Sequence, residues 1–225
     1  MDRQTEETMR ELAERLEPAD FDATLHTITQ AAVELLPHVD YASLTVRHRD
    51  GTVLSCAPTD DILVDLDRTQ DELQEGPCYF AITESPHVIS RDLSVDPRFP
   101  RFGRAAVEVG ILSQAGLRLF KTGEAVAALD LYSKQAAAFE DLGRLDRLFA
   151  HQAATALSYA RELDNLHEAL KTRTVIGQAV GILMERYGLE DQQAFAFLTR
   201  LSSTRHVKLR QLAEEIVADR SSAEG

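Results

Sequence analysis

The last third of the chain has a regular helical pattern, and this pattern restricts its fold more than any other feature of the sequence. Between residues 174 and 188 large apolar side chains recur every three or four positions, which predicts one amphipathic helix. Gly188 would end that helix, because glycine readily adopts the left-handed conformation of a helix C-terminus. Two further inner faces follow, formed by Ala194, Phe195, Leu198 and Leu201 and by Leu209, Leu212, Ala213, Ile216 and Val217. We therefore expect three helices around a small core.

Charge is distributed unevenly between this region and the rest of the chain. Residues 1–166 contain 16 Lys and Arg against 29 Asp and Glu, whereas residues 167–225 contain eight of each. Residues 171–210 contain seven basic residues and only three acidic ones. A local excess of cations suits a phosphate backbone, while the acidic part would repel nucleic acid. Scattered Lys and Arg also occur on ordinary solvated helices, so charge alone leaves both interpretations open.

Several residues of the last third occur at linked spacings: Ala179, Gly181, Leu183 and Met184, then Ala194, Phe195 and Leu198, and finally Lys208 and Leu209. This arrangement resembles the ANTAR domain, a three-helix RNA-binding module of transcription antitermination regulators. Many members of that family have a lysine where this chain has Val180, so a phosphate contact from that position is lost here. The resemblance implies binding to paired stem-loops in nascent transcripts.

Binding to a hairpin loop requires cations for the phosphates and polar or flat groups for the splayed bases. The candidate RNA-binding residues are Arg173, Gln178, Ala179, Arg186, Arg200, Arg205, His206, Lys208 and Arg210. The arginines and the lysine would contact phosphates, and Gln178 and His206 would contact bases. Ala179 and Gly181 would allow close approach of the RNA, and packing between helices is the alternative for both.

The first two thirds of the chain predict helices and antiparallel strands, which together define an α+β domain. Helical patterns cover residues 4–17 and 21–37, and Pro37 ends the second. Strands at 41–48 and 52–57 flank Asp50-Gly51, a dipeptide typical of tight hairpins. After a mostly helical stretch over 61–85, we expect a strand at 87–89, a helix at 101–109 and a second hairpin from 113–120 and 125–132.

Short motifs within this domain follow one another in a distinctive order: Glu75-Gly76-Pro77-Cys78, Arg91-Asp92-Leu93, Asp96-Pro97-Arg98-Phe99-Pro100 and Ala128-Leu129-Asp130-Leu131-Tyr132-Ser133, with Ala138-Phe139 behind them. Together with the layout over residues 20–160 they resemble the GAF domain, a sensory relative of the PAS fold. Actinobacterial proteins that fuse GAF to ANTAR have this combination. The resemblance implies a pocket, filled or empty, between one face of the sheet and the helices of 61–85. It names no ligand.

Cysteine, histidine and acidic residues favour structural roles. Cys56 and Cys78 are too few for a disulfide scaffold or a zinc site, and a free cysteine among apolar residues behaves as a small hydrophobe. An exposed Cys78 thiolate near cations would instead sense oxidation. The histidines His26, His38, His48 and His87 lack ligand spacing, so we expect no metal and no cofactor. Acidic pairs such as Asp65-x-Asp67 lack the ligand set of a calcium loop and are interpreted as solvated loop residues.

Catalytic and membrane functions find little support in the sequence. It contains no nucleophile elbow, phosphate loop or paired-histidine metal motif, so we expect no enzyme. No apolar run approaches the roughly 18 residues that a membrane span requires. The polar N-terminus lacks the apolar core of a secretory signal, and we expect a cytoplasmic protein.

A long helical pattern from Phe139 to Leu170 joins the two parts. Residues on one side step by three and four positions: Leu142, Leu145, Phe149, Gln152, Ala156, Ala160, Leu163, Leu166 and Leu170. Near-heptad spacing predicts a seam between two helices and therefore a homodimer, although the first half of the pattern would equally pack on its own domain. We place a GAF sensor domain with an N-terminal helix at 1–160 and an ANTAR RNA-binding domain at 161–225.

The leading hypothesis is a dimeric, signal-responsive RNA-binding regulator that acts by transcription antitermination on stem-loops. One alternative is a ligand or redox sensor whose ANTAR module docks a protein partner, and another is a degenerate signalling enzyme. Salt-dependent binding to a two-hairpin RNA would support the first hypothesis, because phosphate contacts release counterions. Turnover of a nucleotide would support the enzyme.

Overall fold

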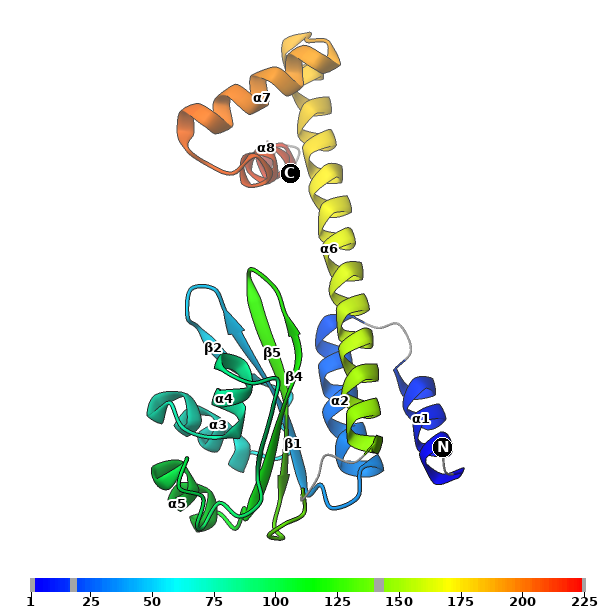
Figure 1. The fold of residues 1–225 in the computed structure, drawn as a ribbon. Coiled ribbons are helices and arrows are strands. Elements are labelled where there is room, and N and C mark those ends of the chain that lie inside the picture. The colour runs from blue at the N-terminus through cyan, green and yellow to red at the C-terminus, as the bar shows by residue number, and fades with distance from the viewer. Residues whose placement is uncertain (1–2, 17–19, 140–143, 224–225) are drawn as a thin grey trace. The chain divides into compact units, whose positions relative to one another are not determined.

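The computed structural model describes residues 3–16, 20–139 and 144–223, and its backbone divides into two compact units (Figure 1). The first unit spans Met1–Arg161 and the second Glu162–Gly225. In the first unit the chain forms α1 (Arg3–Arg15), α2 (Phe21–Leu35), β1 (Tyr41–His48), β2 (Val53–Cys56), α3 (Ile62–Leu73), α4 (Pro77–Thr83), β3 (His87–Ser90), α5 (Pro100–Glu108), β4 (Ser113–Lys121), β5 (Ala125–Ser133) and the first part of α6 (Arg144–Tyr187). The second unit contains the rest of α6, α7 (Asp191–Arg205) and α8 (Leu209–Ala223).

The strands of the first unit form one antiparallel sheet in the order β2-β1-β5-β4-β3. Both predicted hairpins are confirmed: Arg47 pairs with Val53 in the first, and Lys121 pairs with Val126 in the second. Gly51 has a φ of 91° in the first turn, a left-handed conformation that glycine adopts without strain. Because β5 lies in the middle of the sheet, its successive side chains point into two different layers of the domain.

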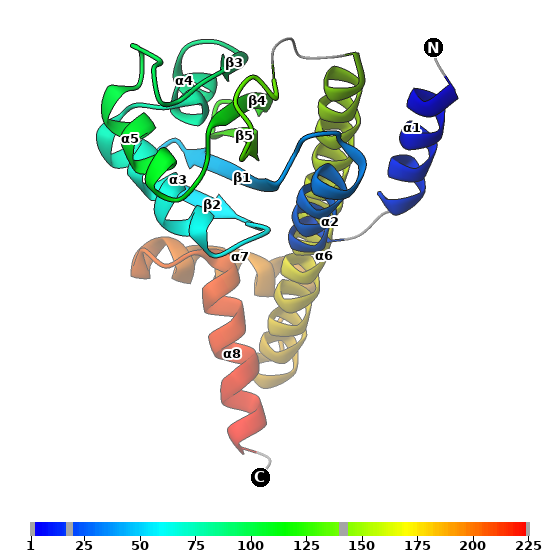
Figure 2. The same ribbon diagram turned by 90° about the horizontal axis from the view of Figure 1, so that it is seen from below.

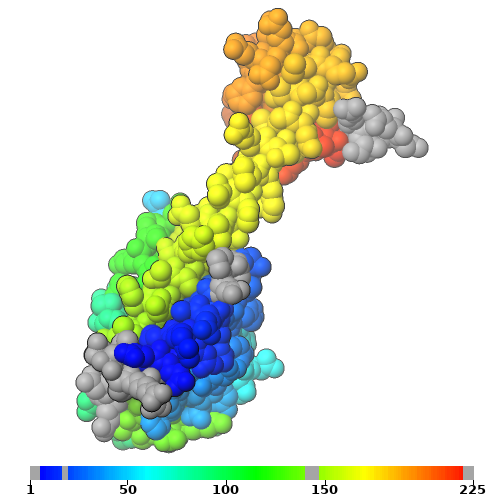
Figure 3. Space-filling model, turned by 90° about the vertical axis from the view of Figure 1, so that its right-hand side faces the viewer, coloured from blue at the N-terminus to red at the C-terminus, as the bar shows by residue number. Residues whose placement is uncertain are grey.

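Helix α2 and the first part of α6 cover one face of the sheet, as two perpendicular views show (Figure 1, Figure 2). Helix α1 packs against α2, and Figure 3 looks onto the surface that these helices form. The layer beneath them is apolar, since Ile28 of α2, Leu44 of β1, Leu129 of β5 and Phe149 of α6 belong to one core. This layer contributes most of the hydrophobic stabilisation on this side of the sheet.

Helix α6 departs from the predicted stripe in register. Its buried positions in the first unit are Phe149, Ala150, Ala153, Leu157 and Ala160. Gln152 of the predicted stripe is exposed, while Leu142 lies outside the described residues, as does the side chain of Leu145. The first half of the pattern therefore packs on its own domain, which was the alternative to a helix seam. Further along α6, Leu166 and Leu170 are 56% and 53% exposed.

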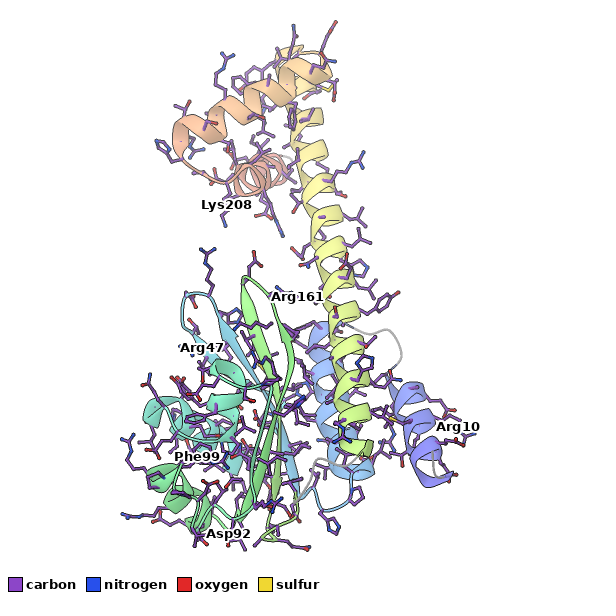
Figure 4. All side chains as sticks on the ribbon, viewed as in Figure 1. Arg10, Arg47, Asp92, Phe99, Arg161 and Lys208 are labelled. Carbon is purple, nitrogen blue, oxygen red and sulfur yellow. The ribbon has the colours of Figure 1, made fainter. Side chains whose placement is uncertain are left out.

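Helices α3, α4 and α5 cover the opposite face of the sheet (Figure 1, Figure 2). Their apolar core joins Leu63 of α3, Ile82 of α4 and Phe102 of α5. The ring of Phe80 meets that of Phe99 edge-on, with centroids 5.1 Å apart, a favourable aromatic geometry. Figure 4 labels Phe99 among these helices.

Glu75 joins the α3–α4 linker to the start of α5. Its carboxylate accepts hydrogen bonds from Arg101 Nε at 2.7 Å and from the backbone N–H groups of Arg101 at 2.9 Å and Phe102 at 3.2 Å. Burial alone would raise the pKa of Glu75, but these hydrogen bonds lower it below its ordinary value. The carboxylate therefore stays ionised and satisfies N–H groups at the first turn of α5.

The second unit is a three-helix arrangement with a small apolar core, as predicted. The core residues are Ala179, Val180, Leu183, Ala194, Leu198, Leu212 and Ala213. The first of its helices is the C-terminal part of α6, and Gly188 follows it with a φ of 64°. Glu190 and Gln193 form a reciprocal capping box that begins α7. Phe195 was expected in the core, but it is 46% exposed, so that part of the prediction is wrong.

Candidate nucleic-acid interface and ligand pocket

One side of α6 in the second unit presents small and polar residues to solvent. Ala179, Val180 and Leu183 point into the core, which leaves Gly177, Gln178 and Gly181 exposed. Gly177 and Gly181 are four positions apart and therefore share a side of the helix. A Cβ atom built on either glycine would have no other group within 4 Å. The helix backbone is thus open to close approach by a ligand at these two positions.

Ala179 does not belong to this exposed side. It is completely buried among the core residues of the second unit, so it cannot contact RNA. Helix packing, the alternative role for this residue, is the one that the structure supports. Val180 is also buried, which places the position of the family's lysine at the core of this chain.

The predicted phosphate-binding cations fall into two groups. Arg205 Nη1 lies 3.1 Å from Glu215, while Arg210 forms ion pairs of 2.6 Å with Glu168 and 2.8 Å with Glu214. The second group consists of candidate cations that are exposed and form no ion pair within the described residues: Arg173, Arg186, Arg200 and Lys208. Figure 4 shows Lys208 at the turn between α7 and α8. This second group is available to bind phosphate without first breaking an ion pair.

Hydrogen bonding to Arg210, followed by that to Lys171, lowers the pKa of Glu168. Because the Glu168 side chain is half exposed to solvent, this pairing gives little stability. His206 is also exposed and caps α7 with a left-handed φ of 53°. Its imidazole is free to stack or donate a hydrogen bond outside the helix.

Exposed aromatic side chains form a feature that the sequence analysis missed. Tyr187 and Phe197 are 59% and 44% exposed, and their ring centroids lie 6.1 Å apart. A surface hollow of about 480 Å³ lies between α6 and α7. It is lined by Phe195 of α7 and by five residues of α6: Glu168, Ala169, Thr172, Arg173 and Ile176. Two residues of separation turn a helix by roughly 200°, so Phe195 and Phe197 point to nearly opposite sides of α7 and cannot both lie in the same core.

The layer between the sheet and helices α3 and α4 is unusually polar. Asp67 of α3 and Asp130 of β5 are both buried. The Tyr132 hydroxyl and the Ser55 hydroxyl donate hydrogen bonds to Asp67, the latter at 2.5 Å, and the Thr45 hydroxyl donates to Asp130 at 2.9 Å. The interpretation of Asp67 as a solvated loop residue is therefore wrong, because helical spacing places it on the inner face of α3 with Leu63, Leu66 and Gln70.

Burial shifts the protonation of this carboxylate pair. It raises the pKa of Asp67, against the opposing effect of hydrogen bonds from Ser55 and Tyr132. It also raises the pKa of Asp130 well above the ordinary value, and the nearby charge of Asp67 adds to this effect. Two close carboxylates in a low dielectric do not both ionise readily, so they titrate as a pair.

Gln70 connects the carboxylates to the rest of the layer. Its amide nitrogen donates to the Tyr132 hydroxyl at 3.3 Å, and its carbonyl accepts from Cys78 N at 3.1 Å and from the Gln114 amide at 3.3 Å. Burial, followed by the charge of Asp130, raises the pKa of the Cys78 thiol well above its ordinary value. A protonated, buried thiol reacts slowly with oxidants, which favours the structural role for Cys78.

The expected ligand pocket is closed in this structure. Between the sheet and helices α3 and α4 there is a crevice of about 10 Å³, lined by Thr45, Arg47, Val53, Asp67, Gln70, Asp71, Cys78, Tyr79 and Ile82. That volume is about that of one water-sized probe, so the polar side chains themselves fill the layer. Over the described ranges, no three His, Cys, Asp or Glu residues group as metal ligands, and no helix is long and apolar enough to cross a bilayer.

Comparison with known proteins identifies both regions. Residues 20–157 match the family model of the GAF domain, and residues 164–217 match that of the ANTAR domain. No curated protein matches the sequence. The GAF match covers more than half of the chain and includes the whole sheet.

Solved structures share the fold at low sequence identity. The GAF domain of a phosphoenolpyruvate-protein phosphotransferase from Coxiella burnetii is 16% identical with a TM-score of 0.51, covering 72% of this chain and 97% of that one. The N-acylhomoserine lactone dependent LuxR family transcription factor CepR2 from Burkholderia cenocepacia is 14% identical with a TM-score of 0.52, covering 72% and 94%. The phytochrome photosensory core module of Stigmatella aurantiaca is 12% identical with a TM-score of 0.57, covering 88% and 44%.

These similarities agree with the geometry of both units. The antiparallel sheet with helices on each face is common to the similar structures, and the small helical core coincides with the second matched range. Both matched domains are regulatory rather than enzymatic. The chain therefore belongs to the GAF domain family and carries an ANTAR domain C-terminal to its GAF domain.

Proposed function

We propose that this regulator binds RNA in response to a signal and acts by transcription antitermination on stem-loops in nascent transcripts. One observation carries the proposal: within the residues that match ANTAR, unpaired cations and exposed aromatic rings share the surface of the second unit. Hairpin loops require this combination, because their phosphates need positive charge and their unstacked bases need flat surfaces.

The exposed side of α6 would contact the RNA backbone. Gly177 and Gly181 allow close approach, and Gln178 beside them can both donate and accept hydrogen bonds from a base edge. Arg173 precedes this side by one turn and is exposed. We assign phosphate contacts first to Arg173, Arg186, Arg200 and Lys208, and only secondarily to Arg205 and Arg210, whose acidic partners would have to be displaced.

We place the sensor domain at residues 1–160 and the RNA-binding domain at 161–225, and we propose that the protein acts as a homodimer. Leu163, Leu166 and Leu170 step by three and four residues, and the last two are more than half exposed. Such a stripe is typical of a helix that packs against a second copy of itself. A change in the GAF domain would then alter packing along α6 and the spacing between two ANTAR domains.

The binding proposal is tested by charge reversal in the second unit. We expect Arg173→Glu combined with Lys208→Glu to weaken binding to a two-hairpin RNA and to lower the magnitude of the log–log salt slope by about two, one for each phosphate contact. Fluorescence anisotropy titrations between about 50 and 200 mM salt measure both quantities. Circular dichroism verifies that the helices remain folded.

A matched control reverses two exposed arginines of the first unit, Arg10 on α1 and Arg104 on α5. Arg10→Glu with Arg104→Glu changes the net charge by the same amount, so it separates local contacts from long-range repulsion. Figure 4 labels Arg10 on the outer side of α1. If folded wild-type protein binds this RNA without salt dependence, or if the control loses as much affinity, the proposal is wrong.

A second candidate function is docking of a protein partner by the ANTAR domain. The hollow beside Phe195 favours it, because an apolar side chain at the rim of a surface depression is typical of helix-docking sites. Phe195→Ala separates the two functions in combination with the salt titration. If the ANTAR domain docks a protein, Phe195→Ala should abolish binding of that protein, and neither the wild type nor the variant should show salt-dependent RNA binding.

A further inference from the structure

The outer ends of the two hairpins carry an excess of positive charge within an acidic domain. Residues 47–53 and 118–126 contain four basic residues and two acidic ones, whereas residues 1–166 contain 16 basic and 29 acidic ones. The four basic residues are Arg47, Arg49, Arg118 and Lys121. Both turns lie at the same end of the sheet (Figure 1), where the Arg49 N–H donates to the Glu124 carbonyl oxygen at 2.8 Å. The backbone therefore brings the two basic segments together.

Sheet register places two of these cations in one row. Arg47 pairs with Val126, and Val126 pairs with Lys121, so the two cations flank Val126. Directly paired residues of an antiparallel sheet point to the same face. Neighbouring strands lie roughly 4.8 Å apart, which puts the backbones of Arg47 and Lys121 about 10 Å from each other. Their long side chains can therefore approach one ligand from both sides.

A β-bulge aims Lys121 at this face. Arg118 pairs with Ala128 of β5, the register then shifts before Phe120, and Lys121 pairs with Val126. Ala128 and Val126 are two residues apart and share a face of β5. Arg118 and Lys121 are three residues apart, so regular alternation would put them on opposite faces of β4. The extra residue of the bulge brings both cations to the same face, a common use of such irregularities.

A surface hollow of about 320 Å³ lies beside this row. Arg47, Arg49 and Lys121 line it, and Ile82 of α4 and Val126 add apolar side chains. The hollow is distinct from the closed layer between the sheet and helices α3 and α4, although Arg47 and Ile82 border both. Figure 4 labels Arg47 near the hairpin ends. The volume is at the lower end of the roughly 300–1,000 Å³ typical of small-molecule sites.

The acidic groups near these cations are already engaged. Among the described residues that line the hollow, Glu124 is the single acid, and its carboxylate lies 3.6 Å from Arg161 Nη2 of α6, the helix on the other face of the sheet. The carboxylate of Asp50 accepts a hydrogen bond from the Thr52 N–H at 2.9 Å. Within the described residues no ion pair joins the three lining cations to an acid. The hollow therefore has positive charge available for an anion from solution.

We propose that this hollow binds a small organic molecule through a phosphate monoester group. Such a group carries a charge of roughly −1.5 to −2 at pH 7 and three acceptor oxygens, which matches a site with several cationic donors. Arginine binds phosphate through a planar fork of donors, and lysine binds it as a point charge. Ile82 and Val126 would contact the organic part. Such a ligand would come in addition to RNA, and its binding does not depend on the proposed function of the ANTAR domain.

Two other anions fit the hollow less well. A carboxylate carries one charge and two acceptor oxygens, so it would match less of the positive charge. An RNA backbone also carries one charge on each phosphate, and the remainder of this acidic domain would repel the phosphates that follow along the strand. A phosphate monoester concentrates its charge at one point, where the cations of both hairpins meet.

Isothermal titration calorimetry of the full chain tests the site, with phenyl phosphate as the probe at constant ionic strength and about pH 7.5, where the phosphate is mostly doubly charged. We expect saturable binding of one molecule per chain. Phenyl sulfate has a similar shape but a single charge and should bind more weakly, as should inorganic phosphate, which lacks the apolar contacts. Absence of saturable binding, or equal affinity for phenyl sulfate, overturns the proposal. Equal affinity for inorganic phosphate would contradict the organic ligand.

Variants locate the binding within the protein. Arg49→Gln and Lys121→Gln remove exposed cations of the hollow, and each should weaken phenyl phosphate binding by about fivefold or more. The matched control Arg104→Gln removes the same charge from the exposed side of α5 and should leave the affinity unchanged. Equal affinity in all three variants, or an equal loss in the control, contradicts the site. If the two hairpin variants weaken RNA binding while phenyl phosphate binds to none of the proteins, the hairpin ends contact RNA and the proposal is wrong.

Discussion

The two domains differ in where the polar groups of their candidate sites lie: inside the GAF domain and on the surface of the ANTAR domain. In the GAF domain two carboxylates, two amides and several hydroxyls lie inside, between the sheet and helices α3 and α4. In the ANTAR domain the core is purely apolar and the cations and aromatic rings lie outside. The difference teaches that the two domains use charge differently, because a buried charge interacts strongly with its neighbours in a low dielectric, whereas exposed cations remain open to a partner from solution. Exposure suits a long polyanion.

The largest expected effect concerns the small core on which the ANTAR surface depends. Leu198→Ala should lower the free energy of unfolding of the second unit by about 2–5 kcal/mol, because Leu198 is completely buried in a core with few other residues. Hydrogen exchange should show the loss in α7 and α8 while the amides of β1, β4 and β5 keep their protection. Equal loss of protection in both units would show that they unfold together and would weaken the comparison.

The next largest effect concerns the exposed rings. Phe197→Ala should reduce RNA affinity by about 1–3 kcal/mol if its ring stacks on a base, without a change in the salt slope, because no charge is removed. Anisotropy titrations at two salt concentrations distinguish this result from loss of a phosphate contact. Unchanged affinity would assign the Tyr187–Phe197 pair to another partner.

The pH dependence of stability tests the interior of the GAF domain. The unfolded chain ionises Asp130 near the ordinary pKa of 3.8, whereas the folded chain keeps it protonated to a much higher pH. Over that window the folded state binds more protons, so stability falls as pH rises from about 4 through the folded pKa, by at most about 1.4 kcal/mol per pH unit. Asp130→Asn should lose this slope, as urea denaturation at several pH values would show. Parallel slopes in both proteins would mean that Asp130 is ionised when folded.

The smallest effect is expected for a surface ion pair. Arg205→Ala removes the 3.1 Å contact with Glu215, and both side chains are about half exposed, so thermal unfolding should change by less than about 1 kcal/mol. RNA affinity should fall less than in Arg173→Ala, because Arg205 already has an acidic partner. A larger loss for Arg205→Ala would mean that its ion pair opens when RNA binds.

The sequence predicted both hairpins and the helical core because their patterns are local. Asp50-Gly51 specifies a turn wherever it stands between alternating strands, and Leu212 and Ala213 follow simple helical spacing. The chain also resembles its families at several linked positions. These signals needed no knowledge of distant contacts.

The buried polar layer was beyond local patterns. The sequence around Asp67 does not reveal that the aspartate is buried, because its hydrogen-bond donor Tyr132 comes from a distant strand of the sheet. Its spacing from Leu63 and Leu66 was the available signal, and it was outweighed by the general tendency of Asp to lie outside. Likewise, the partners of Arg205 and Arg210 come from α8 and α6, so which cations are free depends on tertiary structure.

The bare position at Gly116 has a consequence for how the GAF domain could be tuned. Because the Pro77 carbonyl rests against this strand, even one added methyl would act as a wedge that props α4 away from the sheet. An alanine there would force the Pro77 carbonyl, and with it the first turn of α4, to shift away from β4. The absence of a single carbon atom at Gly116 therefore sets how closely α4 can approach the sheet.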